Sequence, residues 1–565
     1  MFLLAITKSG ISERFASGNV EEFDAHPWKL TIVFDNFLSK ILSENDELSV
    51  IESPLISTNN PKEIVLSQAK YSRDKGILEI SKPLESGRAI YYDLDSKGNF
   101  FCSTHISMLR QAGVEIRENT AALPEFFVFR FIMPPMTLYE DISQLRTGSR
   151  LRVKTSEEKC KIETINDFSL PKEKNPTAIK DFREKTSDLL SQSIQPLSAC
   201  KSRLGLLLSG GLDSSLLYKT CQNLNFDFDT TYSTGYPFED FEKEYAISAA
   251  NFFGTNHIYH EITMPDYLRG VIEANSVAEQ PLPHMQSVLL YLLQKDGIPK
   301  NKDIVLNGQG AELSCNRTGF LTYQFRRRLS RLWLLKKVGK LPIVSRWSSA
   351  KWAADYQSKI DLPVKDPNNV IWSSDPVGSL EWTSEHFTLP QEAIIKNPLN
   401  TITQFGEQPI QDMVTTYDLL NQNDHTMSVW SKIGESQKKI VYFPYNYSAL
   451  VNYFFSIPPD IKFKTYKHVL KEVAHQSGVP SFIINRRKLG FNPLSNLDLL
   501  KKELFEPLIP IASKVFDEQQ MRKVLPSDWG FNFWTLWNIL NYSIWKRLWI
   551  NNEPPEALVE QIAAD

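Results

Sequence analysis

The stretch Ser209-Gly210-Gly211-Leu212-Asp213-Ser214-Ser215 follows an apolar run over residues 204–208. A short apolar run next to glycines predicts a buried strand, and residues 212–224 have a helix-like pattern. Between them, the glycines would let a ligand approach the backbone. The start of the helix would offer unpaired N–H groups at the positive end of its dipole. This order of strand, glycine turn and helix predicts a cradle for an anion.

The side chains of the cradle indicate which anion it would bind. Ser209, Ser214 and Ser215 add hydroxyl donors. Asp213 would repel a bare phosphate, so its expected role is to hold Mg²⁺, which then bridges to phosphate oxygens. An ordinary P-loop is excluded because the sequence has no G-x-x-x-x-G-K-[ST]. The structural alternative is a glycine turn followed by an Asp or Ser helix cap.

The segments around the cradle alternate between strand-like and helix-like patterns. Such alternation is typical of right-handed crossovers in a doubly wound parallel sheet, so we expect an α/β fold. Beyond residue 320 the pattern is mainly helical and rich in tryptophan. Strands are predicted at 204–208, 226–232, 258–262 and 304–306, and helices at 212–224, 239–253 and 287–294.

The first part of the chain has a different pattern. Short apolar runs separated by Gly, Asn, Asp and Ser predict a mostly β domain over residues 1–165. The polar stretch 166–177 is predicted to be a linker, and 178–565 the second domain. The expected strands of the first domain lie at 2–6, 29–34, 76–80, 89–93 and 150–153.

Composition excludes several classes of protein. The chain has 565 residues, 42% hydrophobic and 23% charged, which is typical of a folded multidomain protein. Its net charge of -3 gives no field that favours nucleic acid or an anionic membrane. Five scattered cysteines, the lack of a signal-like start and the lack of a long apolar segment predict a cytoplasmic protein without a membrane partner.

The cradle resembles the pyrophosphate loop of the ATP pyrophosphatase superfamily, and several further matches are similar to its asparagine synthetase branch. That resemblance implies ATP and Mg²⁺ as cofactors, with ATP cleaved between its α and β phosphates. It also implies a glutaminase-like, N-terminal-nucleophile sandwich before the synthetase domain. The matching stretches are Tyr236-Pro237-Phe238-Glu239-Asp240, Gly254-Thr255-Asn256-His257, residues 304–312, Phe443-Pro444-Tyr445, residues 486–491, 87–92 and 135–139.

The resemblance also implies roles for single residues. Asp213 and Glu312 would be metal ligands, although Glu312 stands where the family has Asp and could instead cap a helix. Lys488 would contact the phosphates and the acyl intermediate, where a fixed ammonium lowers the barrier. The structural alternative is that Lys488 is a solvent-exposed lysine without a role in catalysis. The residues implied to bind the nucleotide are Leu208, Ser209, Gly210, Gly211, Leu212, Asp213, Ser214, Ser215, Ser233 and Gly308.

The first domain departs from the family at its nucleophile. The family's glutaminase uses a cysteine that becomes the first residue when the initiator methionine is removed. Here Phe2 stands at that position and the nearest cysteine is Cys102. A phenyl ring cannot attack an amide, and an internal thiol lacks the free α-amine that serves as base. The first domain is therefore predicted to keep the fold without hydrolysing glutamine.

The second departure is Gln309. Relatives carry an acidic residue, tyrosine or histidine there, which in lactam-forming members helps to deprotonate the attacking amine. An amide cannot accept that proton as a general base. Another residue could take the role (Glu435, Glu279 and His284 are candidates), the amine could arrive neutral, or Gln309 could position substrate.

The prediction for function is an ATP-dependent ligase that adenylates a carboxylate and joins it to a non-glutamine amine. The bond could form within one molecule, as in β-lactam synthetases and lasso-peptide cyclases. The alternatives are amidation with free or partner-supplied ammonia, and a nucleotide-binding scaffold without activity. The basic amphipathic segment 325–340 is interpreted as a surface helix packed on the core or as a docking site for a peptide or carrier protein.

Overall fold

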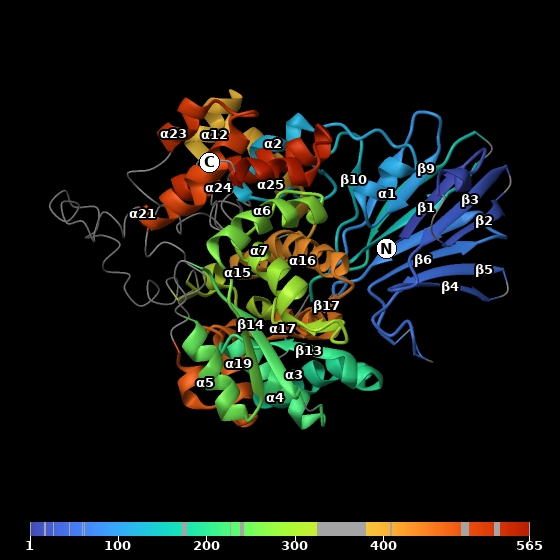
Figure 1. Ribbon diagram of the computed structural model, residues 1–565. Helices are drawn as coiled ribbons and strands as arrows, with labels where there is room; N and C mark the ends of the chain where they lie inside the picture. The colour runs from blue at the N-terminus through green and yellow to red at the C-terminus, as the bar shows by residue number, and fades with distance from the viewer. Residues whose placement is uncertain are drawn as a thin grey trace, which may run out of the picture.

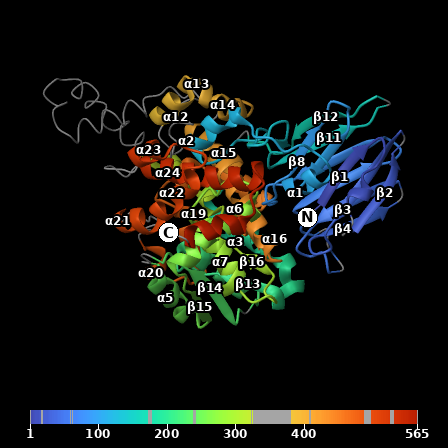
Figure 2. The same cartoon turned by 45° about the horizontal axis from the view of Figure 1, so that its top comes forward.

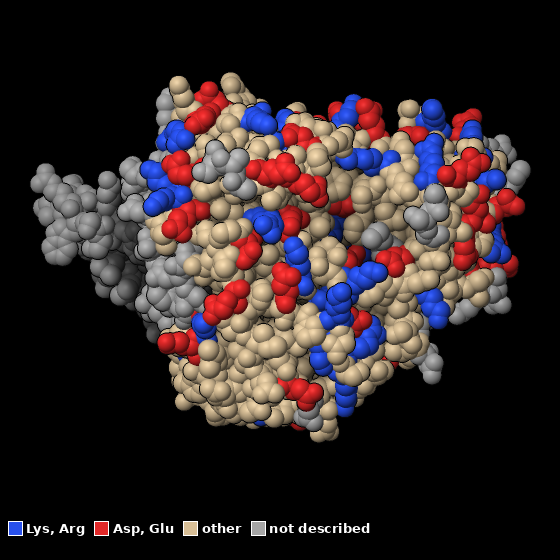
Figure 3. Space-filling view, viewed as in Figure 1, with Lys and Arg blue, Asp and Glu red and all other residues tan. Residues whose placement is uncertain are grey.

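The computed structural model shows a β-rich N-terminal part beside a larger, mainly helical part (Figure 1). On the visible face, acidic and basic side chains are interspersed (Figure 3), in keeping with the small net charge. No described helix is both long enough and apolar enough to span a membrane. The structure describes residues 2–563 except 16–18, 26, 45, 59, 61–62, 157, 172–177, 227, 238–241, 322, 325–379, 407–408, 487–496 and 525–530.

Two antiparallel sheets form the N-terminal part, in the orders β10-β8-β9-β1-β3-β2 and β12-β11-β7-β6-β5-β4. They share one apolar core, to which Leu4 contributes from the first sheet and Val50 from the second, so the region is a sandwich (Figure 2). The strands are β1 (Phe2–Thr7), β2 (Asn19–Ala25), β3 (Trp28–Phe34), β4 (Ser39–Glu44), β5 (Glu47–Glu52), β6 (Ser67–Ser72), β7 (Ile77–Lys82), β8 (Tyr91–Leu94), β9 (Phe100–Ser103), β10 (Ser143–Gln144), β11 (Ser149–Lys154) and β12 (Lys161–Asn166). Two helices, α1 (Ile106–Gln111) and α2 (Leu123–Phe129), lie between β9 and β10 in sequence.

The second part contains a five-stranded sheet in the order β15-β14-β13-β16-β17, with every pair parallel. Ile304 and Leu306 pack in one apolar core and Val305 in another, because helices cover both faces of the sheet. The elements are α3 (Ala178–Ile194), β13 (Leu204–Leu207), α4 (Leu212–Asn223), β14 (Thr230–Thr234), α5 (Lys243–Phe253), β15 (Asn256–His260), α6 (Met264–Ala278), α7 (Gln286–Leu292), β16 (Ile304–Leu306) and β17 (Ile440–Tyr442).

Two boundaries in this sheet differ from the predicted ones. β14 begins at Thr230 rather than at residue 226, because Phe226 and Phe228 are apolar residues of the core and not of the strand. β15 begins at Asn256, two residues earlier than predicted. Strand β17 was not predicted, because its three residues come soon after a helix, whereas asparagine and glycine follow the equally short β16.

Apart from β17, the residues beyond 320 that the structure describes are mainly helical, as predicted. The basic segment 325–340 lies outside the described residues, so a docking role for it stays a prediction. The helices are α12 (Leu380–Phe387), α13 (Gln391–Ile394), α14 (Lys396–Thr403), α15 (Ile410–Asp418), α16 (Asp424–Ser436), α17 (Ser448–Ser456), α18 (Pro459–Lys462), α19 (His468–Gln476), α20 (Ser481–Ile484), α21 (Leu497–Leu500), α22 (Glu506–Ala512), α23 (Glu518–Val524), α24 (Phe531–Trp545) and α25 (Pro555–Ala563).

The two parts share a continuous hydrophobic core. Phe127 of α2 contacts the rings of Trp382 in α12 and Tyr542 in α24. Buried charges cross the same interface: Lys82 of β7 donates to Asp424 of α16 at 2.8 Å. The β-rich part is therefore fastened to the helical part by both apolar and ionic contacts.

Glu125 of α2 is a buried acid at this interface. Its carboxylate accepts from the backbone N–H of Met133 at 2.6 Å and from Asn397 Nδ2 at 3.1 Å. Burial raises the pKa of Glu125 to about 8, above the value near 4.3 of an unfolded chain. Between pH 4.3 and pH 8, Glu125 keeps its proton in the folded protein but loses it in the unfolded chain. The contribution of Glu125 to the free energy of unfolding is therefore lost as the pH rises through this range.

Replacing Glu125 by glutamine should remove this pH dependence. Between pH 5 and pH 9 the wild-type protein should lose on the order of 3 kcal/mol of unfolding free energy through this group, and the variant should not. Denaturant titrations at both pH values measure the difference. Equal pH dependence in the two proteins would show that Glu125 is ionised in the fold.

Candidate active site

The predicted cradle lies at the carboxyl end of β13. The N–H of Leu208 donates to the carbonyl of Tyr232 at 2.9 Å, which extends the pairing of β13 and β14 up to the turn. Helix α4 then begins at Leu212, and no side chain caps its N-terminus at Gly211. Uncapped N–H groups at a helix start are the donors that phosphates use.

The serine hydroxyls close the cradle from the side. Ser214 Oγ accepts from the N–H of Ser209 at 3.2 Å and lies 3.3 Å from Ser209 Oγ. Arg486 donates to the carbonyl of Ser209 at 3.4 Å and pairs with Glu242 at 2.9 Å. Residues 487–496 follow Arg486 directly but lie outside the described residues, so the role of Lys488 stays a prediction.

The cradle requires glycine at Gly210. Its φ of +67° lies in the left-handed region, and an added Cβ would come within 2.2 Å of the carbonyl oxygen of Tyr245. Gly210→Ala should therefore cost about 1–3 kcal/mol of stability and weaken Mg·ATP binding at least about tenfold. Calorimetric titration and thermal unfolding measure the two effects.

Gly211→Ala is the matched control for this substitution. A Cβ at Gly211 would contact only Ser209 Oγ, at 3.3 Å, and the backbone there is extended. Equal binding losses in the two variants would contradict a special role for the backbone conformation at Gly210.

Two carboxylates converge beside the cradle on one buried ammonium. Lys467 Nζ lies 2.7 Å from Asp213 Oδ2 and 2.9 Å from Glu312 Oε1. Tyr466 OH donates to the other oxygen of Glu312 at 2.7 Å. Burial alone would lower the pKa of Lys467, but the two carboxylates outweigh it and raise that pKa well above its usual value.

The parallel sheet explains why these side chains meet. Asp213 stands in the first turn of α4 after β13, and Glu312 follows the neighbouring strand β16. Gly308 packs directly against Asp213, and Tyr445, just after β17, donates its hydroxyl to the Asp213 carbonyl at 2.8 Å. Segments far apart in sequence thus meet at the carboxyl edge of the sheet, where open α/β sheets bind ligands.

The donor set fits the magnesium ion that the resemblance implies. Two carboxylates that share one positive charge also offer the oxygen ligands that Mg²⁺ prefers. The ammonium of Lys467 stands at the point that both carboxylates reach.

Ser233, near the end of β14, lies on the strand next to the cradle. Its hydroxyl is 2.7 Å from His257 Nε2 of β15. The position fits the predicted contact with a nucleotide held at the cradle, which remains a prediction.

Gln309 and the candidate bases have partners that do not favour proton transfer. Gln309 Nε2 donates to Asn423 Oδ1 at 3.1 Å. Glu435 forms an ion pair with Arg88, and its second oxygen lies 3.5 Å from His105 Nε2. A carboxylate held by a guanidinium is a weak base.

The other two candidates are also engaged. Glu279 is buried, which alone would raise its pKa, but Lys432, His105 and the Ser107 hydroxyl lower that pKa to about 2. His284 lies 3.3 Å from Arg130 Nη1. Burial and this neighbour lower the pKa of His284 well below its usual value. A general base for the amine remains to be identified.

The asparagine synthase family model matches residues 185–547, which include the cradle, both carboxylates and Lys467. The chain belongs to the asparagine synthase family. It is also similar to asparagine synthetase [glutamine-hydrolyzing] 1 of Bacillus subtilis (strain 168), with 22% identity over 511 residues that cover 84% of this chain and 76% of that protein. Membership in the asparagine synthase family implies ATP-dependent amidation by a carbon–nitrogen ligase.

The N-terminal part precedes the segment that the family model matches, and neither its first described residue nor the cysteine nearest to that residue in sequence is an exposed thiol. Phe2 is fully buried in β1, where its N–H donates to Thr104 Oγ1 at 3.2 Å. Cys102 lies in β9 next to β1, and burial raises the pKa of its thiol far above the usual value. Neither residue has the properties of a nucleophile.

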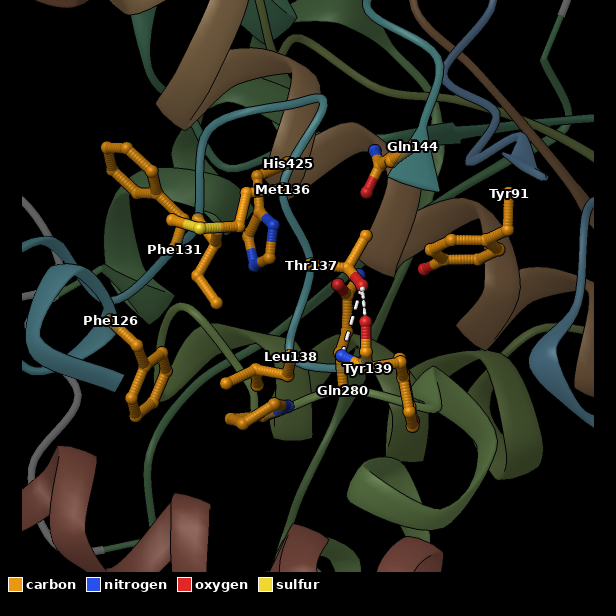
Figure 4. Close-up of a pocket in the computed structure, with 12 residues that line it drawn as sticks. Tyr91, Phe126, Phe131, Met136, Thr137, Leu138, Tyr139, Gln144, Gln280 and His425 are labelled. Atoms are coloured by element: carbon orange, nitrogen blue, oxygen red, sulfur yellow. Dashed lines mark hydrogen bonds between the residues drawn. The ribbon is translucent and has the colours of Figure 1, made fainter. Parts of the chain in front are cut away.

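A small cavity lies at the interface of the two parts (Figure 4). It has a volume of about 20 Å³, room for one water-sized molecule. Phe126, Met136 and Tyr139 line it from the N-terminal part, and Gln280 and His425 from the other. Gln280 Nε2 and His425 Nε2 have no hydrogen-bond partner among the described residues. The cavity thus offers polar contacts to a small guest.

Lys467 and Tyr466 are the residues that sequence reasoning missed. A lysine in a polar stretch before a helix has no local signature, and only the fold shows that it lies between Asp213 and Glu312.

Proposed function

We propose that this chain activates a carboxylate with Mg·ATP, forming an acyl-adenylate and pyrophosphate, and joins it to an amine that does not come from glutamine. The observation that carries the proposal is the convergence of Asp213, Glu312 and Lys467 beside the uncapped start of α4. Donors for phosphate oxygens and ligands for a divalent cation are thus side by side.

Each part of this arrangement has a chemical task. The N–H groups at the start of α4 and the hydroxyls of Ser209 and Ser214 would bind phosphate oxygens. Asp213 and Glu312 would hold Mg²⁺, which would neutralise charge on the triphosphate. Lys467, and Lys488 as a prediction, would place ammonium groups near the leaving pyrophosphate.

The N-terminal part supports the proposed source of the amine. Phe2 and Cys102 are buried and lack the properties of a nucleophile, which supports an amine from the substrate itself or from a second molecule. Formation of a lactam or macrolactam within one substrate is one form of this reaction. The enzyme would then act mainly by holding amine and activated carbonyl together away from water.

Amidation with ammonia is the second candidate, and the cavity at the interface favours it. Ammonia has the size of a water molecule, and the cavity offers it Gln280 Nε2 and His425 Nε2, which have no hydrogen-bond partner among the described residues. Asn423, two residues before His425 in sequence, is hydrogen-bonded to Gln309 next to the cradle. His425 of the cavity lining is thus close in sequence to a residue that contacts Gln309.

Pyrophosphate release from Mg·ATP tests both candidates. We expect release of pyrophosphate and AMP with a panel of carboxylates and amines, unchanged by adding glutamine. Stimulation by ammonium together with aspartate would instead support the second candidate. Binding of ATP without turnover across peptide, amino-acid and carrier-linked carboxylates would favour a scaffold and contradict the proposal.

A further inference from the structure

His257 lies between two hydroxyls on the neighbouring strand. Thr231 and Ser233 are alternate residues of β14 and therefore share one face of the sheet, and His257 pairs with Thr231 in the register of β14 and β15. The imidazole bridges them: Nδ1 is 2.9 Å from Thr231 Oγ1, and Nε2 is 2.7 Å from Ser233 Oγ.

The imidazole in this bridge is neutral at physiological pH. Burial lowers the pKa of His257 to about 4. A neutral imidazole has a single N–H, so one ring nitrogen donates and the other accepts. The direction of hydrogen bonding at Ser233 therefore depends on which nitrogen carries the hydrogen.

The contact of Thr231 with the backbone favours one direction. Thr231 Oγ1 lies 3.3 Å from the carbonyl oxygen of Asn256, which can only accept. If Thr231 gives its hydrogen to that carbonyl, it accepts from Nδ1–H, and Nε2 then accepts from the Ser233 hydroxyl. All three contacts are hydrogen bonds in this arrangement, whereas the reverse tautomer leaves the contact of Thr231 with Asn256 without a hydrogen.

The consequence is that Ser233 has no hydrogen left for a ligand. Its hydroxyl donates inward to His257, and the described residues offer Ser233 Oγ no other partner. The remaining lone pair is available at the carboxyl edge of the sheet, on the strand beside the cradle. A nucleotide there would meet an acceptor and not a donor.

We propose that His257 is a positioning residue that holds Ser233 as a hydrogen-bond acceptor and so selects a nucleoside that presents a donor. Two groups of ATP have that chemistry: the purine 6-amino group and a ribose hydroxyl. This inference rests on the proposed function, because it requires that ATP binds at the cradle.

The first test compares the binding of four nucleotides to the full chain by calorimetry. Mg·ITP replaces the 6-amino group by a carbonyl, and Mg·2′-deoxyATP and Mg·3′-deoxyATP each lack one ribose hydroxyl. Wild-type protein should bind one of these analogues about tenfold more weakly than Mg·ATP, the value of one good hydrogen bond. Ser233→Ala should lower the affinity for ATP to that of the analogue and abolish the discrimination.

Variants around the imidazole distinguish a role of His257 in orienting the Ser233 hydroxyl from a role in stability alone. His257→Phe keeps a ring but frees the Ser233 hydroxyl to donate, so preference for ATP over the discriminated analogue should shrink and, for the 6-carbonyl of ITP, should reverse. Thr231→Val leaves Ser233 unchanged but removes the acceptor for Nδ1–H, so it should also reduce the preference for ATP over the analogue. His260→Phe is the control, because His260 lies on β15 like His257, and it should leave that preference unchanged.

Nitrogen NMR of the histidine rings provides a readout that a purely structural role would not move. The wild-type spectrum should contain a neutral Nδ1–H tautomer that disappears in His257→Phe. An Nε2–H tautomer, or analogue affinities that stay in the same ratio in Ser233→Ala, would overturn the inference while leaving ATP binding intact. Failure of wild-type protein to bind Mg·ATP would instead overturn the proposed function with it.

Discussion

Asp213→Asn should lower pyrophosphate release by about 10²–10³-fold. The substitution keeps the shape of the side chain but removes the charge that faces Lys467 at 2.7 Å. It also removes one of the two carboxylates that would hold Mg²⁺. Because the carbonyl of Asp213 still accepts from Tyr445, the turn itself should be preserved. Pyrophosphate release under saturating Mg·ATP measures the effect.

Asp303→Asn is the matched control for this prediction. Asp303 is also an ion-paired aspartate, held by Arg203 at 2.8 Å, but it precedes β16 and so lies at the opposite edge of the sheet. It should leave pyrophosphate release near the wild-type value. Full activity of Asp213→Asn would place the chemistry elsewhere in the molecule.

Lys432→Met should destabilise the fold by about 3–5 kcal/mol. Lys432 is the only cation paired with Glu279 among the described ion pairs, and the two side chains are 2% and 3% exposed. The same carboxylate accepts from the N–H groups of Ile106 and Ser107 at the start of α1, which ties the β-rich part to α6. Removing the ammonium leaves a buried carboxylate without a counter-charge. Denaturant unfolding measures the loss.

The pKa of Glu279 determines how the free energy of unfolding should change with pH. In the wild-type protein the pKa of Glu279 is about 2, below the value near 4.3 of an unfolded chain. Its stabilising contribution is therefore present above pH 4.3 and is lost as pH falls towards 2. In Lys432→Met the buried carboxylate should take up a proton more readily, so the destabilisation should shrink as pH falls from 7 to 5.

Two further variants complete the comparison. Lys432→Met combined with Glu279→Gln should recover part of the loss, because no buried charge remains. Lys295→Met breaks the more exposed pair with Glu273 on the same helix α6 and should cost less than about 1 kcal/mol. Equal losses in Lys432→Met and Lys295→Met would show that burial does not control the energy of the pair.

Local pattern was enough to find the cradle and the strands beside it. Ser209–Ser215 carries its own signature, since glycines, hydroxyls and an apolar strand adjoin one another in the chain. Phe226 and Phe228 misled the assignment of β14, because an apolar run that packs against a helix looks like a strand. Glu435 was a reasonable candidate base until the fold placed it against Arg88 from the other part of the chain.

The sequence by itself determined the α/β character of the second part, the anion cradle and the family resemblance, because these depend on residues that are neighbours in the chain. Only the tertiary structure decided that Lys467 lies between Asp213 and Glu312, and that Glu279 and Glu435 are held by Lys432 and Arg88. The physical reason is that a charge acts on whatever lies within a few ångströms of it. Those neighbours are set by how strands and helices pack, whatever their separation along the chain.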